Sequence, residues 1–211
     1  MGDTDPDIRR NPKRQQLIDG AYKVFIEHGF EGASVDEIAR AAGASKATLY
    51  SYFPDKRQLF EAVVQSRCSQ QRTVICSGAP GQPIEATLHR MARTFASFLH
   101  SAAAQEMFRV CIAESGRFPD LGAAFYEAGP AQARARLVEF FQGAADRGEL
   151  AIDDPVIAAD QFAALCKSGG FLRALLGAPP VAEAEIDRVA EEAVKTFLAR
   201  YAATQPALTS A

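Results

Sequence analysis

The chain has 211 residues, of which 48% are hydrophobic and 23% are charged, with a formal net charge of -3 at pH 7. This composition is typical of a folded globular protein and excludes disordered and fibrous classes. The apolar runs are far shorter than the roughly 20 residues that cross a bilayer, and the acidic start does not resemble a signal peptide, so we expect a cytoplasmic protein.

A first helix is predicted from Asn11 to His28, because apolar residues recur there at the spacing of one helix face and Gly29 suits a left-handed C-terminal cap. Four basic residues gather at its start, namely Arg9, Arg10, Lys13 and Arg14. Phosphate contacts need local rather than global positive charge, so this cluster is compatible with DNA binding by an acidic chain. Both an arm along the DNA and a solvated tail remain open for it.

Three more helices are predicted in the N-terminal part of the chain. Ser34 opens a capping box of the form S-x-x-E, at the start of a short helix that Gly43 ends. Ser45 can cap a second short helix, which Pro54 ends, and a longer helix over residues 56–77 follows. Two short helices joined by a three-to-four-residue turn are typical of a helix-turn-helix.

The rest of the chain shows helical periodicity and no convincing strand. The best candidate linker is the segment 78–82, Pro119 and the Gly129-Pro130 step interrupt the pattern, and Asp154 caps a long helix that begins at Pro155. The predicted fold is therefore all-α with about nine helices. Its parts are a three-helix helix-turn-helix domain over residues 1–55, a connecting helix over 56–77 and a C-terminal ligand-binding and dimerisation domain over 78–211.

Residues 34–53 (SVDEIARAAGASKATLYSYF), with Pro54-Asp55-Lys56 and Leu59-Phe60 after them, closely resemble the DNA-binding domain of the tetracycline-repressor (TetR) family. The resemblance extends from about residue 15 to 63. It implies a transcription regulator, most commonly a repressor, that binds a palindromic operator as a dimer and is released by a small, apolar effector. The residues that it places at the DNA are Ser34, Ser45, Lys46, Ala47, Thr48, Tyr50, Tyr52 and Lys56.

The chemistry of the recognition helix agrees with this assignment. The hydroxyls of Ser45 and Thr48 can bond base edges or phosphates, and Lys46 can reach a guanine acceptor or a phosphate. The methyl group of Ala47 suits contact with a thymine methyl.

The remaining candidates flank the recognition helix or line its edge. Tyr50 and Tyr52 are expected at the sugar-phosphate backbone, although Tyr52 can also belong half to the core. Ser34 and Lys56 lie at helix N-termini, where the helix dipole favours phosphate. For Lys56, a purely solubilising role is the alternative.

The segments 114–121 (ESGRFPDL) and 125–130 (FYEAGP) resemble the C-terminal domain of AefR-like TetR regulators, which implies a mostly apolar effector pocket. Aromatic and sulfur-containing residues could line it, although a phenylalanine at helical spacing is more often ordinary core. The candidates for its lining are Met91, Phe95, Phe108, Cys111, Phe125 and Phe141. The polar candidates to orient an effector are His89, Arg93, His100 and Gln105.

A homodimer is expected because one helix-turn-helix contacts few base pairs, whereas two can bind half-sites roughly 34 Å or more apart. By resemblance, the last two helices pair with those of a second copy. Gly169-Gly170 would allow close backbone approach there, or would merely kink the helix. The expected interface residues are Phe162, Leu165, Gly169, Gly170, Val194 and Phe197.

Other classes of function are less well supported. No nucleophile elbow, zinc-protease motif, phosphate loop or C-x-x-C pair is present, so we expect no enzyme, no cofactor and no metal site. A redox sensor would need a reactive thiol, for which Cys68 beside Arg67 and Cys111 near Arg109 are the only hints. A protein-interaction module would show no salt-dependent DNA binding.

Overall fold

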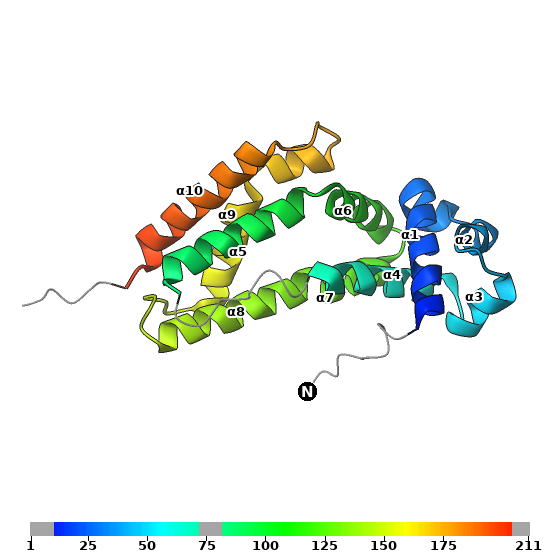
Figure 1. Ribbon diagram of the computed structural model, residues 1–211, viewed down its shortest axis with the longest axis horizontal. Coiled ribbons are helices and arrows are strands. Elements are labelled where there is room, and N and C mark those ends of the chain that lie inside the picture. Colours follow the sequence, from blue (N-terminus) through cyan, green and yellow to red (C-terminus); the bar gives the residue numbers. More distant parts are fainter. Residues whose placement is uncertain (1–10, 72–81, 204–211) are drawn as a thin grey trace, which may run out of the picture. The chain divides into compact units, whose positions relative to one another are not determined.

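The computed structural model describes residues 11–71 and 82–203, and within them the chain forms ten helices and one isolated β-bridge, between Leu150 and Ala202 (Figure 1). The helices are α1 (Pro12–Gly32), α2 (Val35–Ala41), α3 (Lys46–Tyr52), α4 (Lys56–Gln71), α5 (Ile84–His100), α6 (Ala102–Ser115), α7 (Pro119–Ala128), α8 (Pro130–Asp146), α9 (Pro155–Leu175) and α10 (Glu183–Tyr201).

The all-α prediction is confirmed, with one more helix than expected. Pro119, predicted to interrupt the chain, instead occupies the first turn of α7, where a proline costs nothing because its missing N–H would have no helical partner. Of the predicted linker 78–82, all but Gln82 lies outside the described residues.

Two compact units make up the described chain. The first contains residues 11–71 and 106–131, so α1 to α4 share a core with α7 and with α6 from Glu106 onward. The second contains residues 82–105 and 132–203, with α5, α9, α10 and most of α8. Residues 106–131, expected in the C-terminal domain, therefore pack together with the N-terminal helices.

Side-chain caps begin the first three helices, and those of α2 and α3 are the ones that the sequence predicts. The Asn11 side chain accepts hydrogen bonds from the N–H groups of Lys13 and Arg14, both at 3.1 Å. Ser34 and Glu37 form the complete capping box of α2. Ser45 accepts from the N–H of Thr48 at 3.1 Å, so each short helix has a defined first turn.

The core of the first unit centres on a group of aromatic rings. Phe25, Phe30 and Phe60 pack against one another with ring centroids 5.1 to 5.9 Å apart. Phe118, which precedes α7, adds an edge-to-face contact with Phe30 at 5.2 Å. Leu121 of α7 is fully buried in the same cluster, so α7 is part of this core rather than a loose appendage.

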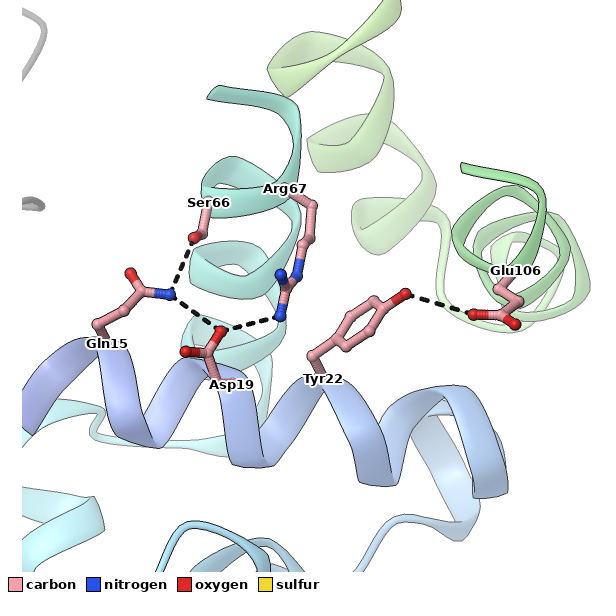
Figure 2. A network of polar contacts seen from close by, with 6 residues as sticks. All are labelled: Gln15, Asp19, Tyr22, Ser66, Arg67 and Glu106. Carbon is pink, nitrogen blue, oxygen red and sulfur yellow. Dashed lines mark hydrogen bonds and ion pairs between the residues drawn. The ribbon is translucent and has the colours of Figure 1, made fainter. Parts of the chain in front are cut away.

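A polar network joins α1, α4 and α6 within the first unit (Figure 2). The Arg67 guanidinium donates to Asp19 at 2.9 Å and lies over the ring of Tyr22, 4.0 Å from its centroid. Gln15 also donates to Asp19, at 3.1 Å, and the Tyr22 hydroxyl donates to Glu106 at 3.4 Å. Partial burial and the neighbouring Glu106 carboxylate both raise the pKa of Tyr22, so its hydroxyl stays protonated and remains a donor.

The second unit is built on α5, α9 and α10, with α10 running alongside α5 (Figure 1). Its aromatic cluster contains Phe141, Phe162, Phe197 and Tyr201, whose neighbouring ring centroids lie 4.7 to 5.5 Å apart. Ser168 has a left-handed φ of 49° and breaks the regular backbone inside α9. The break thus lies at Ser168, one residue before Gly169-Gly170, where a kink was the alternative to a role in close helix approach.

Candidate functional site

The turn between α2 and α3 rests directly on α1. Gly43 holds this turn with a φ of 55°, a conformation that favours glycine. The Gln16 side chain donates to the Ala42 carbonyl at 2.7 Å. A Cβ atom on Gly20 would lie 2.6 Å from Ala42 backbone atoms, so only glycine allows α1 to approach the turn this closely. The orientation of α3 is thus fixed by contacts with α1 that local sequence patterns do not reveal.

One side of α3 is buried and the other is presented to solvent. Leu49 is completely buried, whereas Ser45, Lys46, Ala47 and Tyr50 are exposed. Tyr50 is one of the few large hydrophobic side chains with about half of its surface exposed, at 49%. These four predicted DNA-binding residues therefore lie on accessible surface, as contact with a groove requires.

The cation of Lys46 is held by an acidic neighbour on α2. Its ammonium lies 2.8 Å from Asp36, and both side chains are more than half exposed. The hydrogen bond to Asp36 raises the pKa of Lys46, so the side chain keeps its charge. An exposed ion pair of this kind contributes little to stability and can be exchanged for a contact with a phosphate or a base.

The hydroxyls of Ser45 and Thr48 lie 2.9 Å apart at the start of α3. Because Ser45 already accepts from the Thr48 N–H, its oxygen has a structural role as well as a possible contact role. Thr48 is half-buried, which leaves part of its side chain accessible beside Lys46.

Tyr52 is half-buried at the far end of α3, in agreement with the expectation that it is partly core. Its hydroxyl accepts from the Asn11 side chain at 3.4 Å. Arg14 lies next to this position, with its guanidinium carbon 5.1 Å from the centroid of the Phe53 ring. Of the predicted basic cluster, Lys13 and Arg14 thus lie in the first turn of α1, and Arg9 and Arg10 lie outside the described residues.

Lys56 has a role that its sequence position did not suggest. Its ammonium donates to the carbonyls of Glu31 and Ala33 at 3.1 and 3.0 Å and lies 4.8 Å from the centroid of the Phe30 ring. Partial burial lowers the pKa of Lys56. The side chain of Lys56 therefore stabilises the connection between α1 and α2. Ser34 remains exposed at the N-terminus of α2.

The segment 114–121 binds the end of α1 through polar contacts within the first unit. The Glu114 carboxylate accepts from the N–H groups of Phe30 and Glu31 at 2.9 and 3.3 Å. Arg117 pairs with Glu31, and Asp120 pairs with Arg57 at 2.6 Å. A residue that satisfies backbone groups 83 and 84 positions away leaves no local signal, so sequence patterns could not assign this role to Glu114.

The predicted pocket residues divide between the two units. Met91, Phe95 and Phe141 are buried in the second unit, where Phe141 belongs to the aromatic cluster. Cys111, Phe108 and Phe125 belong to the first, with the two phenylalanine rings 5.0 Å apart in an edge-to-face contact. Their assignment to one effector pocket remains a prediction.

Three of the expected interface residues have no surface to offer a second copy. Phe162, Val194 and Phe197 are at most 1% exposed within their own protomer, because they form its core. Gly170 is also buried, against His100 and Val181. Gly169 is exposed and Leu165 is half-buried. Leu172 near the end of α9 and its C-cap residue Leu176 are large apolar residues that are 60% and 80% exposed.

The described thiols are poorly placed for redox sensing. Cys111 is 2% exposed, and burial raises the pKa of Cys166 to about 12. The prediction for Cys68 lies outside the side chains that the structure describes. Within the described ranges there is no cluster of metal-ligating side chains and no helix long and apolar enough to span a membrane.

We expect Cys166 to resist iodoacetamide in the native protein at pH 8, because a pKa of about 12 leaves roughly one thiol in ten thousand ionised and the sulfur is buried. Peptide mapping by mass spectrometry after timed alkylation measures this, with the same protein in urea as the control. Rapid native alkylation of Cys166 would favour the redox sensor instead.

Known proteins match both parts of the chain. Residues 17–63 match the family model of the N-terminal domain of bacterial regulatory proteins of the tetR family. Residues 86–203 match the model of the C-terminal domain of AefR-like transcriptional repressors. Together the two models cover most of the sequence.

Individual relatives agree with these matches. A TetR-family transcriptional regulator from Mesorhizobium loti is 32% identical, with a TM-score of 0.82 over 92% of this chain and 98% of its own. The flavonoid-responsive regulator FrrA is 34% identical, with a TM-score of 0.79 over the same shares, 92% and 98%. The repressor AcnR of Corynebacterium glutamicum is 36% identical over 62 residues, which are 29% of this chain and 33% of AcnR, so the chain matches about a third of this curated relative. With a helix-turn-helix held on α1 and both family models matched, the chain belongs to the TetR family of bacterial transcription regulators.

Proposed function

We propose that this protein binds a palindromic operator in cytoplasmic DNA as a homodimer and represses transcription until a small effector releases it. The observation that carries the proposal is that α3 has one buried side and one exposed side. Its buried side chain, Leu49, holds the helix on the core, while Lys46 and Tyr50 project from a helix whose orientation is fixed by α1. Such a rigidly held, exposed helix is what reading the major groove requires.

The homodimer is proposed to form through the exposed apolar side of α9. Leu172 of α9 and its C-cap residue Leu176 are large hydrophobic residues with most of their surface exposed, and they lie one helical turn apart beyond the break at Ser168. Apolar side chains in the centre of an interface are typical of permanent homodimers. A second copy of the same surface is the occupant because DNA with two-fold symmetry is read by a protein with two-fold symmetry.

The effector is proposed to be a small, largely apolar molecule. Support comes from FrrA, a flavonoid-responsive regulator that is 34% identical over nearly its whole length. An effector acts only if it binds the state that cannot hold DNA more tightly than the state that can.

A mobility-shift titration of the full chain against the DNA flanking its own gene, at several salt concentrations, tests this function. We expect saturable binding at one palindromic site that weakens as salt rises, because phosphate contacts release counterions. Binding that does not distinguish this DNA from a scrambled duplex, or no binding by the intact dimer, would refute the proposal.

A further inference from the structure

An acidic side chain lies on the same accessible surface as the predicted DNA-binding residues. Asp36 of α2 is exposed, and its carboxylate lies 2.8 Å from the ammonium of Lys46 on α3. An exposed ion pair contributes little to stability, so folding does not explain this contact. A negative charge beside DNA is also repelled by the phosphates, so the position of Asp36 needs another explanation.

Both members of the ion pair keep the capacity to bind a further partner. The capping box of α2 is complete without Asp36, because Ser34 and Glu37 bond to each other through side chains and backbone N–H groups. A carboxylate has about four lone-pair sites, and an ammonium has several N–H donors. The bond between Lys46 and Asp36 therefore leaves a cationic donor and an anionic acceptor next to each other on the surface.

The backbone that carries this ion pair is held by a closed turn. The N–H of Gly43 donates to the Arg40 carbonyl at 3.0 Å, and the N–H of Ala44 donates to the Ala39 carbonyl at 2.9 Å. The turn also packs tightly against α1 at Gly20. The spacing between the α2 and α3 side chains is thus set before DNA binds, as precise recognition requires.

A G·C base pair presents the matching groups in the major groove. Guanine has two acceptors there, O6 and N7, and cytosine has a donor amine, N4. O6 and N4 are hydrogen-bonded to each other, so they lie about 2.9 Å apart, close to the 2.8 Å between the charged atoms of Lys46 and Asp36. An A·T pair suits the ion pair less well, because thymine offers one acceptor beside an apolar methyl group.

We propose that Lys46 and Asp36 together read one G·C pair in each operator half-site, with Lys46 donating to guanine and Asp36 accepting from the cytosine amine. The proposal rests on the operator binding proposed above and names a base pair that the operator must contain. It adds an acidic side chain to a set of predicted DNA-binding residues that contains none. Because the ion pair has no net charge, it selects among sequences rather than strengthening binding to all DNA.

Selection from a library of randomised DNA duplexes by the full-length protein, followed by sequencing, tests the proposal without knowledge of the operator. We expect the wild type to enrich a palindrome and to prefer G·C about tenfold at one position of each half-site. Asp36→Asn keeps an oxygen that can bind Lys46, but its amide N–H groups cannot accept from the cytosine amine. The preference at that position should fall to about twofold or less, while the other positions keep theirs.

Glu191→Gln is the matched control, because Glu191 of α10 lies 2.7 Å from Lys195 and its side chain is 56% exposed, compared with 61% for Asp36. This variant should enrich the same sequence as the wild type. Fluorescence anisotropy with modified duplexes checks the base pair itself. Inosine in place of guanine keeps O6 and N7 and should bind equally well, whereas 7-deazaguanine lacks N7 and should bind about tenfold more weakly.

Three results would contradict the proposal, and they separate it from the proposed function. An enriched palindrome without the G·C preference would overturn this inference while operator binding stands. A preference that survives Asp36→Asn would also overturn it, because Asp36 would then only orient Lys46. Failure to enrich any palindrome would overturn the proposed function, and this inference with it.

Discussion

Alanine at Lys46 or Tyr50 is expected to weaken operator binding about tenfold or more, while the fold and the dimer stay intact. Each side chain is about half exposed on α3 and supports no core packing. Loss of a phosphate or base contact typically costs about 1–3 kcal/mol of binding free energy in such complexes. Loss of the Lys46 charge should also lower the slope of log affinity against log salt concentration by about one, because one counterion fewer is released on binding. Fluorescence anisotropy titrations at three salt concentrations measure both effects.

Two surface residues serve as matched controls for these substitutions. Tyr126 of α7 is 52% exposed, compared with 49% for Tyr50. Lys195 of α10 is paired with Glu191 at 2.7 Å and is as exposed as Lys46, which is paired with Asp36 at 2.8 Å. Tyr126→Ala and Lys195→Ala should leave operator affinity within about twofold of the wild type. If they weaken binding as much as Lys46→Ala and Tyr50→Ala do, α3 is not the recognition helix.

The features that could be predicted from the sequence are the helix starts and ends, because residues close together in the chain determine them. Ser34 and Ser45 cap helices through atoms three residues away, so a short window contains both partners of each hydrogen bond. Pro54 and Gly43 end helices for equally local reasons. The helix-turn-helix was therefore predictable in position and in most of its exposed residues.

The errors arose where distant residues decide the outcome. Periodicity showed that Phe162 and Phe197 lie on apolar helix faces, but it could not tell whether the chain's own core or a second copy covers them, and the core does. The phosphate contact of Lys56 stays a prediction, but its hydrogen bonds to two carbonyls of the α1–α2 connection could not be foreseen, because those carbonyls lie more than twenty residues away. Glu114 was recognised as part of a segment that resembles the family. The backbone amides that it binds could not be predicted, because they lie in α1.

The largest expected effect on stability is at Gly20. No role could be assigned to it from the sequence, because its contact is with a distant residue. Gly20→Ala should destabilise the protein by about 3 kcal/mol, because the new Cβ would lie 2.6 Å from the backbone of Ala42 and overpacking against backbone cannot be relieved by a rotamer change. The α2–α3 turn must then move away from α1, so operator affinity should fall together with stability. Urea unfolding followed by circular dichroism measures the first effect, and anisotropy measures the second.

Gly32→Ala is the matched control, because it makes the same substitution at the C-terminal end of α1, beyond the break at Gly29. Its Cβ would meet only the His28 side chain, at the ordinary distance of 3.5 Å, and should change the unfolding free energy by less than about 1 kcal/mol, in the stabilising direction. If Gly20→Ala unfolds at the same urea concentration as Gly32→Ala, α1 does not hold the turn, and the rigid presentation of α3 that supports the proposed function is lost. If only Gly20→Ala loses both stability and operator affinity, one close helix approach connects the core of the first unit to DNA recognition.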